Sequence, residues 1–319
     1  MALPNAAVIL GAGWSIPAGL PSAADLFAGE LQVASATAYQ HLSVVQAAYE
    51  RWAERQAEPK AELFLRECYE NNLYPAPWPY VVEYVQARLA TPVWPDRRSF
   101  SSLRYGQRIT NRTYCWPHEE FWLGLRKRVI LSGVATTNYD LLAERSLRHR
   151  QMKRPPLPGF HYAGLPKPIV ALGQAEPWTV HDRRSHVLLT GLIPLAKLHG
   201  SLNWTVSGGK SLTVYQDTRA AFRQGGTVAI VPPIPEKVPP AWLSPVWTAA
   251  RDLLARSSIW IVVGYSLPEY DHAIRGLLTS AAGRNLSHIE LHDPYAAQLE
   301  RQWNSLLPSV KVLCCPGIA

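Results

Sequence analysis

Short hydrophobic runs that end in glycine, proline or polar residues recur along much of the chain. Runs of this kind, rich in β-branched side chains, are typical of strands that are buried on both faces of a parallel sheet. The strands expected on this basis are Ala7–Gly11, Gly133–Thr137, Ile169–Gly173, Leu195–His199, Val228–Pro232, Ile259–Gly264, His288–Asp293 and Val310–Cys314. Helix-favouring segments at 245–255 and 271–282 lie between some of them. This alternation predicts an α/β protein with a Rossmann-like, doubly wound parallel sheet.

Residues 25–128 show a different pattern. The stretches ADLFAGELQVASATAYQHLSVVQAAYERWAERQ and VVEYVQARLA are rich in residues that favour helices. We therefore expect a mostly helical insertion between the first and second strands. Residues 151–190 are rich in proline and histidine and are expected to form a loop-rich excursion. The whole chain, 1–319, is predicted to be one α/β domain that carries both segments.

The formal net charge is +8. The basic residues stand in short, dispersed clusters such as 126–128 and 183–184, with no long basic tail. A solvated surface is therefore the favoured interpretation, and direct binding of nucleic acid stays an open alternative.

The cysteines form no CxxC pair, so the sequence predicts no metal site; they are Cys68, Cys115, Cys314 and Cys315. The start, MALPNAAVIL, lacks the basic region and long apolar core of a signal peptide. The longest apolar runs are far shorter than a membrane span. We expect a cytoplasmic protein with reduced thiols and no membrane partner.

Residues 8–23, VILGAGWSIPAGLPSA, predict a strand that feeds a glycine loop. Gly11 and Gly13 would let a ligand approach the backbone, and Ser15 adds a hydroxyl donor. The spacing is not GxGxxG, because Ile16 stands where the third glycine would fall. A phosphate-binding loop and a tight turn without a ligand are equally compatible with this segment alone.

Polar residues follow two of the predicted strands. Asn138 and Asp140 come at the carboxyl end of one strand, where ligands of open α/β sheets bind, although either residue can instead cap the next helix. His199 ends another strand and is followed by Gly200. A histidine at such a position is a candidate general base, with a purely structural role as the alternative.

Two more strand ends carry candidate ligand contacts. Ile259–Asp271, IWIVVGYSLPEYD, places Gly264 and Ser266 after a buried strand, as in a second nucleotide-binding turn. Asp293 ends the strand of HIELHDP, where a carboxylate is placed to meet a ribose.

Taken together and in this order, these segments resemble the sirtuin family. GAGWSIPAGLP resembles the family's GAG-x-S-x-x-[AS]-G-[IL]-P loop, and TTNYD resembles its T-Q-N-[IL]-D. LHGS matches its histidine motif, and VVGYSL resembles its V-G-T-S-L turn. The resemblance runs from Gly11 to about Asp293. It implies a Rossmann-like domain that consumes NAD.

The departures from the family pattern are informative. No arginine follows the glycine loop at 21–27, and the paired CxxC zinc module of protein deacylases is missing. The stretches TTNYD, KLHGSLNW and GYSLPEYD are more similar to the sirtuin-like NAD-consuming domains of bacterial antiviral systems. That branch implies an NAD⁺ hydrolase that acts as an abortive-infection effector, with NAD as substrate and without zinc.

The resemblance also implies a role for each candidate residue. His199 would be the general base, Asn138 would position the attacking water or the nicotinamide ribose, and Asp140 would receive the carboxamide of nicotinamide. Three other parts of NAD would be bound by the remaining candidates. The diphosphate would be held by Gly11, Ala12, Gly13 and Ser15. Phosphate or the adenosine ribose would be contacted by Gly264 and Ser266, and the adenosine ribose hydroxyls by Asp293.

Other functions stay open at the level of sequence. The chain can instead be an NAD-dependent protein deacylase or ADP-ribosyltransferase, or a non-catalytic subunit that senses NAD or ADP-ribose. The product of hydrolysis can be linear or cyclic ADP-ribose. If the chain is a defence effector, its trigger is expected from a homo-oligomer or from a separate sensor protein, such as an ATPase or an Argonaute-like subunit.

Overall fold

The computed structural model describes residues 3–28, 41–90, 116–148, 160–165, 192–208, 211–215, 218, 221, 227–233 and 239–318. The expected strand at 169–173 and most of the excursion at 151–190 lie outside these residues.

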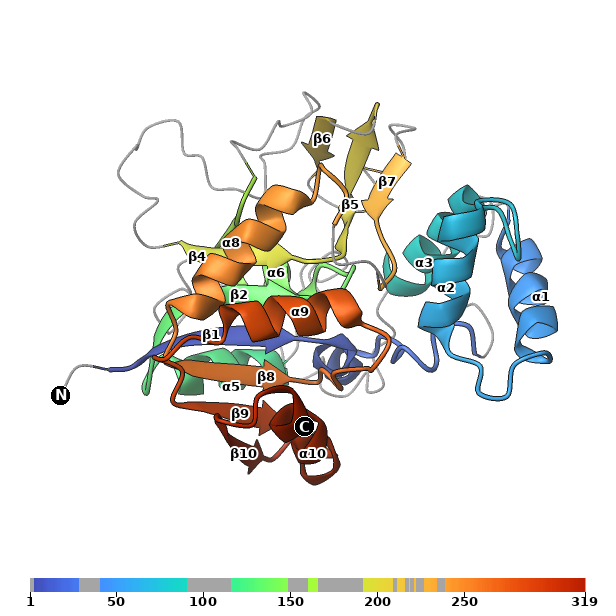
Figure 1. Ribbon diagram of the computed structural model, residues 1–319. Helices are drawn as coiled ribbons and strands as arrows, with labels where there is room; N and C mark the ends of the chain where they lie inside the picture. The colour runs from blue at the N-terminus through green and yellow to red at the C-terminus, as the bar shows by residue number, and fades with distance from the viewer. Residues whose placement is uncertain are drawn as a thin grey trace, which may run out of the picture.

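A seven-stranded sheet forms the centre of the molecule (Figure 1), with the order β10-β9-β8-β1-β2-β4-β3. Every pairing in it is parallel, which confirms the predicted doubly wound sheet. Its strands are β1 (Asn5–Leu10), β2 (Ile130–Thr136), β3 (Phe160–Tyr162), β4 (Ile193–Lys197), β8 (Ile259–Val263), β9 (His288–His292) and β10 (Lys311–Cys315). The central strands β1 and β8 are almost wholly buried because both faces are covered by helices.

The strand order reverses at β1. The chain builds outward from β1 through β2 to β4 and β3 on one side, then crosses over and builds from β8 through β9 to β10 on the other. Loops that leave the carboxyl ends of β1 and β8 therefore diverge. Ligands of doubly wound sheets bind in the crevice at such a switch point.

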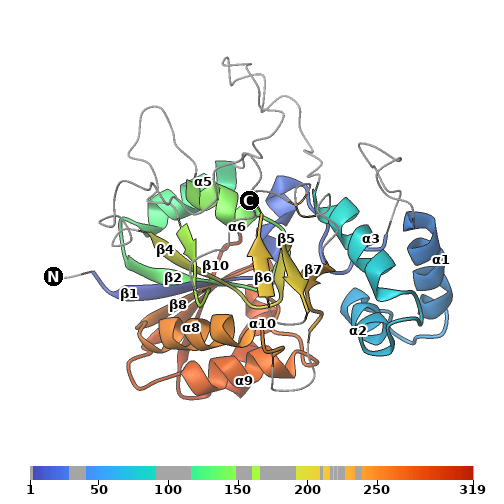
Figure 2. The same ribbon diagram turned by 90° about the horizontal axis from the view of Figure 1, so that it is seen from above.

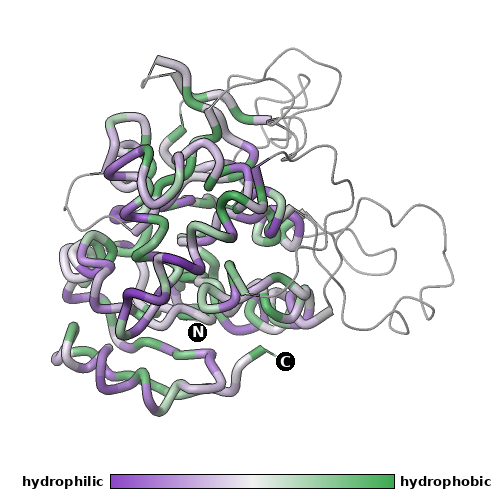
Figure 3. Tube along the Cα trace, turned by 90° about the vertical axis from the view of Figure 1, so that its right-hand side faces the viewer, coloured by the Kyte–Doolittle hydropathy of each residue, from purple (hydrophilic) through white to green (hydrophobic). Residues whose placement is uncertain are grey.

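Helices cover both faces of this sheet. Figure 2 shows α8 (Ser244–Ala255) and α9 (His272–Ala281) on one face and α5 (Trp116–Leu125) and α6 (Leu142–Arg148) on the other. At the edge of the sheet, α10 (Ala296–Leu306) packs on β9 and β10. Hydrophobic and hydrophilic residues alternate along the chain around the sheet, as amphipathic elements around a shared core require (Figure 3). No helix among the described residues is long and apolar enough to cross a membrane.

A second, smaller sheet stands beside the first. It is antiparallel, has the order β6-β5-β7, and consists of β5 (Gly200–Ser207), β6 (Ser211–Val214) and β7 (Thr227–Ile230). The sequence predicted a strand at 228–232 in the parallel sheet, and that placement is wrong. An apolar run identifies a buried strand but not its partner, and here the partner of β7 is β5.

Between β1 and β2, helices α1 (Leu42–Ala53), α2 (Ala61–Asn71) and α3 (Trp78–Ala90) share a hydrophobic core of their own. Phe27, Phe64 and Tyr84 lie in it, with ring centroids 5.0 Å apart for both Phe27–Phe64 and Phe27–Tyr84. Leu202 and Ile230 of the small sheet belong to the same cluster. The helices are therefore joined to the rest of the protein through the antiparallel sheet.

Helix α5 differs from these three helices, although it falls within the same 25–128 span. Its Trp122 and Leu125 are buried in the main core, not in the core of α1 to α3. Trp122 also donates a hydrogen bond from Nε1 to Ser146 Oγ of α6 at 2.9 Å. In packing, α5 belongs to the layer that covers the large sheet.

The loops after β1 and β8 touch backbone to backbone. Gly13 N donates to Gly264 O at 2.9 Å, and a Cβ atom on Gly11 would lie only 2.4 Å from that same oxygen. Gly264 has a φ of 60°, and its Cβ would lie 2.4 Å from Gly13 Cα. The glycines therefore have a structural reason to be here that needs no ligand: any side chain would push the two loops apart.

This contact predicts a large loss of stability for Gly264→Ala. An alanine here would strain the backbone, which is in the left-handed region, and its Cβ would crowd Gly13. Together these effects should lower the free energy of unfolding by about 2–5 kcal/mol in denaturant titrations. Gly276→Ala is the matched control, because no atom within 4 Å would meet its Cβ in the middle of α9. It should stabilise the protein by up to about 1 kcal/mol. Equal stabilities of the two variants would contradict this account of the loop contact.

Candidate functional site

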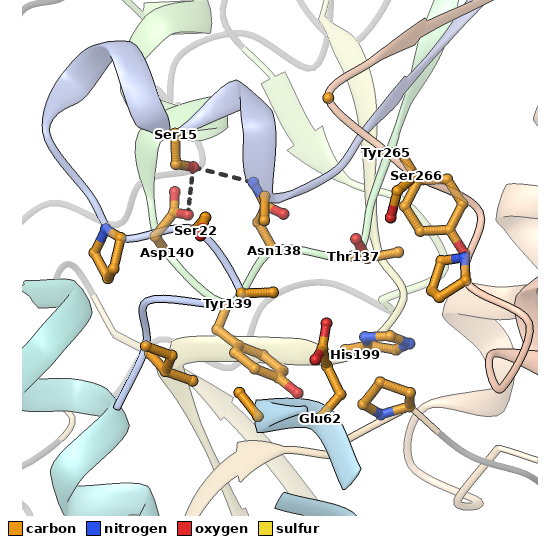
Figure 4. A pocket seen from close by; sticks show the side chains of 18 of the residues that line it. Ser15, Ser22, Glu62, Thr137, Asn138, Tyr139, Asp140, His199, Tyr265 and Ser266 are labelled. Carbon is orange, nitrogen blue, oxygen red and sulfur yellow. Dashed lines mark hydrogen bonds between the residues drawn. The ribbon is translucent and has the colours of Figure 1, made fainter. Parts of the chain in front are cut away.

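A pocket opens at the carboxyl ends of β1, β2, β4 and β8 (Figure 4). Its walls come from the glycine loop, the TTNYD loop, His199, the loop after β8 and the first turn of α2. The polar side chains among its lining residues are Ser15, Ser22, Glu62, Thr137, Asn138, Tyr139, Asp140, His199, Tyr265, Ser266 and Asp271.

His199 has the arrangement expected of a base. It is 4% exposed, and its Nε2 has no hydrogen-bond partner among the described residues. Burial lowers the pKa of His199 by more than the charge of Asp271 and the backbone of Thr137 raise it. The ring is therefore neutral at pH 7 and can accept a proton.

Asp271 lines the same pocket as His199 and was not among the residues predicted from sequence. Its negative charge raises the pKa of His199 and so opposes part of the effect of burial. Asp271 is 1% exposed, accepts a hydrogen bond from the Tyr265 hydroxyl at 2.7 Å, and caps α9 by accepting from Ile274 N at 3.3 Å. In the sequence, Asp271 follows GYSLPEY directly and looks like an ordinary residue that caps the next helix. The sequence therefore does not indicate a role for it in the pocket.

Ser15, Asn138 and Asp140 form a hydrogen-bonded chain on the opposite wall (Figure 4). Ser15 Oγ donates to Asp140 Oδ2 at 2.7 Å and accepts from Asn138 Nδ2 at 3.0 Å. Asn138 Nδ2 also donates to the carbonyl of Gly11 at 2.8 Å, and Asp140 Oδ1 accepts from Leu142 N at the start of α6. The capping alternative is therefore realised for Asp140, while its second oxygen faces the pocket network.

The backbone amides of the glycine loop are mostly occupied. Gly11 N donates to Val263 O, Gly13 N to Gly264 O, and Ser15 N to Ala12 O. Gly11 and Gly13 are also absent from the pocket wall, whereas Ala12 and Ser15 are part of it. A ligand in this structure would thus meet the backbone of Ala12 and the side-chain hydroxyl of Ser15, while the two glycines act through the packing of the loops.

The remaining candidates divide between the pocket and the surface. Gly264 and Ser266 line the pocket. Asp293 follows β9 but does not line it, and its Oδ1 accepts a hydrogen bond from Tyr295 N at 2.8 Å. A contact between Asp293 and a ribose thus requires a ligand that extends beyond the pocket.

A buried ion pair holds the TTNYD loop in place from below. Lys197, on β4, lies 3.0 Å from Glu144 of α6, and both side chains are 0% exposed. Lys197 Nζ also donates to the backbone carbonyl of Asp140. Burial raises the pKa of Glu144, and the nearby Lys197 counters this only in part. The pair ties β4, α6 and the loop that carries Asn138 into one unit.

One group of possible metal ligands lies away from the pocket. Glu290, His292 and Cys315 have ligand atoms within 4.8 Å of one another on β9 and β10. Both oxygens of Glu290 already accept from Arg128, at 2.6 and 2.7 Å. Burial alone would raise the pKa of Glu290, but His292 and Arg128 together lower it to about 2. The guanidinium would repel a metal cation, so this cluster is better explained as an ion pair that joins the end of α5 to the sheet.

The chain was compared with known proteins. No protein-family profile matches it, and no curated protein matches it. Solved structures with a similar fold include Sir2Tm bound to a propionylated peptide, with 12% identity, 98% of this chain and 88% of that chain covered, and a TM-score of 0.43. A Sir2 homolog–NAD complex is 13% identical, with 97% of this chain and 83% of that chain covered and a TM-score of 0.41. A Sir2 homologue S24A mutant–ADP ribose complex is 14% identical, with 95% of this chain and 90% of that chain covered and a TM-score of 0.42.

The electrostatics of His199 can be measured directly. In an NMR titration its imidazole should show a pKa below the ordinary 6.5, and Asp271→Asn should lower it further by removing the negative charge. Asparagine keeps the helix cap, which limits structural change. Asp252→Asn, an exposed site on α8, is the control, and His199→Gln identifies the resonance. An unchanged or higher pKa in Asp271→Asn would rule out this coupling.

The buried ion pair gives a second prediction. Lys197→Met leaves Glu144 buried without its partner and should lower the free energy of unfolding by about 3–5 kcal/mol. Adding Glu144→Met removes the orphaned carboxyl group and should recover much of that loss. Chemical denaturation of both single variants and the double variant completes the cycle. Strict additivity of the two single changes would show that the pair is not coupled.

Proposed function

We propose that this chain is an NAD⁺ hydrolase that cleaves the bond between nicotinamide and ribose. The observation that carries the proposal is His199: a buried, neutral imidazole that lines a pocket at the switch point of a doubly wound sheet and whose Nε2 has no hydrogen-bond partner among the described residues. Dinucleotides bind at such switch points. The ordered likeness of four sequence segments to the sirtuin family points to the same substrate.

The reaction needs little more than a positioned water and this base. Water attacks C1′ of the ribose, the C1′–nitrogen bond breaks, and nicotinamide leaves as a neutral molecule with the bonding electron pair. The proton of the attacking water passes to Nε2 of His199, which gives ADP-ribose as the second product. The negative charge of Asp271 then stabilises the imidazolium.

The other pocket residues would bind and orient the dinucleotide. Ala12, Ser15 and Ser266 line the part of the pocket nearest the glycine contact and would take the diphosphate. Asn138 would orient the nicotinamide ribose or the water, and Asp140 would receive the carboxamide. Gly11, Gly13 and Gly264 would contribute by holding the two loops together. Asp293 would reach only the adenosine end.

The cellular role proposed here is antiviral defence through loss of NAD. It rests on the similarity of the TTNYD, KLHGSLNW and GYSLPEYD segments to the sirtuin-like domains of bacterial antiviral systems. An effector of this kind has to stay quiet until infection, so its activity would be switched on by self-assembly or by a separate sensor protein. NAD turnover should accordingly rise with protein concentration or on addition of that partner.

The decisive experiment is NAD⁺ turnover by the purified protein without any acceptor peptide, with products separated by chromatography. His199→Ala and Asn138→Ala should each lower turnover by about 100-fold or more, the range in which general acid–base catalysis contributes. His288→Ala is the control, because His288 begins β9 at the end of the sheet opposite the pocket. Circular dichroism and unfolding curves verify that the variants are folded.

The products separate the proposed function from its alternatives. Linear ADP-ribose with free nicotinamide supports hydrolysis, and a cyclic product would replace water with a ribose hydroxyl as nucleophile. Nicotinamide release that requires an acyl-lysine peptide or a protein acceptor would indicate a deacylase or an ADP-ribosyltransferase. Tight binding of NAD without turnover at any protein concentration would favour the sensing subunit. Full activity in a folded His199→Ala protein would falsify the assignment of the base.

A further inference from the structure

The helical insertion places a carboxylate in the pocket. Glu62 lies in the first turn of α2, and Ala61, Glu62 and Leu65 all line the pocket. Figure 4 shows the carboxylate of Glu62 directed into the pocket, on the side of Tyr139 and His199. Burial raises the pKa of the Tyr139 hydroxyl, and the negative charge of Glu62 raises it further.

The start of α2 lies close to the loop after β8. Lys60 Nζ lies 5.8 Å from the centre of the Tyr270 ring. Burial raises the pKa of the Tyr270 hydroxyl, and the charge of Glu62 raises it further. The insertion therefore forms one wall of the pocket and places the carboxylate of Glu62 on it.

The charges of the lining residues are all of one sign. Among the described residues of the wall, the ionisable carboxylates are Glu62, Asp140 and Asp271, and neither lysine nor arginine is present. Asp140 is engaged by Ser15 and by the start of α6, and Asp271 by Tyr265 and the start of α9. Glu62 is the partly exposed member of the three. The His199 side of the pocket therefore favours a cationic group.

We propose that Glu62 is a substrate-recognition and catalytic residue that favours the positively charged nicotinamide-riboside half of NAD⁺. This inference rests on the proposed function. The pyridinium ring carries a positive charge that moves to the ribose as the C1′–nitrogen bond breaks, so a nearby carboxylate stabilises both the bound substrate and the transition state. The reduced dinucleotide NADH has a neutral ring and gains nothing from Glu62.

The same carboxylate sets the direction in which the dinucleotide binds. The diphosphate is anionic and would be repelled from the Glu62 side of the pocket. On the glycine-loop side the carboxylate of Asp140 already accepts from Ser15 and Leu142. The backbone of Ala12 and the hydroxyl of Ser266 are therefore left for the diphosphate.

The test compares Glu62→Gln with wild type and with Glu70→Gln, the same change of charge on the exposed side of α2. Calorimetry measures the Kd of carba-NAD⁺, a non-cleavable pyridinium analogue, and of NADH. Glu62→Gln should reduce the preference for the cationic ligand by about tenfold, the size expected for one unit charge at a few ångströms in a partly solvated site. It should also lower kcat/KM for NAD⁺ by at least about tenfold.

The outcomes are distinct. A lower preference in Glu62→Gln with Glu70→Gln unchanged supports the role of Glu62. Equal preferences in all three proteins, with carba-NAD⁺ bound by wild type, would overturn it and leave the proposed function intact. Failure of wild type to bind carba-NAD⁺ would overturn the proposed function itself. If Glu62→Gln unfolds, Glu62→Ala is used instead, since alanine removes the same charge and favours the helix.

Discussion

The close approach of two backbone segments at the centre of the sheet determines the geometry of the site. Gly13 N bonds to Gly264 O, and no side chain fits between the loops that leave β1 and β8. These loops diverge because the strand order reverses between them, so without this contact the crevice would be wider and its walls independent. With it, Ser15 on one loop and Ser266 on the other line the same pocket.

The pocket combines two kinds of structure. The carboxyl ends of parallel strands supply groups at fixed positions, such as His199, which follows β4. A doubly wound sheet alone leaves that crevice open to water. Here the helical insertion closes one side through Ala61, Glu62 and Leu65, and the insertion is itself anchored by its shared core with the antiparallel sheet. Exclusion of water strengthens every charge interaction inside.

The sequence predicts six of the seven strands of the central sheet, because each contains a short stretch of apolar residues with a glycine, a proline or a polar residue after it. It misses β3, a strand of three residues in the segment that was expected to be rich in loops. Asn138 and His199 were identifiable because they end two of the predicted strands. Glu62 was not, because an acidic residue near the start of an amphipathic helix is ordinary and its relation to the pocket depends on how the insertion docks. Residues 228–232 were assigned to the wrong sheet because strand partners are set by long-range contacts that local patterns do not encode.

Burial keeps His199 neutral and also limits its strength as a base. Removal from water keeps the imidazole neutral, which a base requires, but makes the imidazolium formed after proton transfer costly. Asp271, buried and hydrogen-bonded by Tyr265, offsets part of that cost. Because Asp271 also caps α9, its position relative to the ring is set by the fold and not by the ligand. The strength of the base is therefore built into the junction between β8 and α9, before any substrate enters.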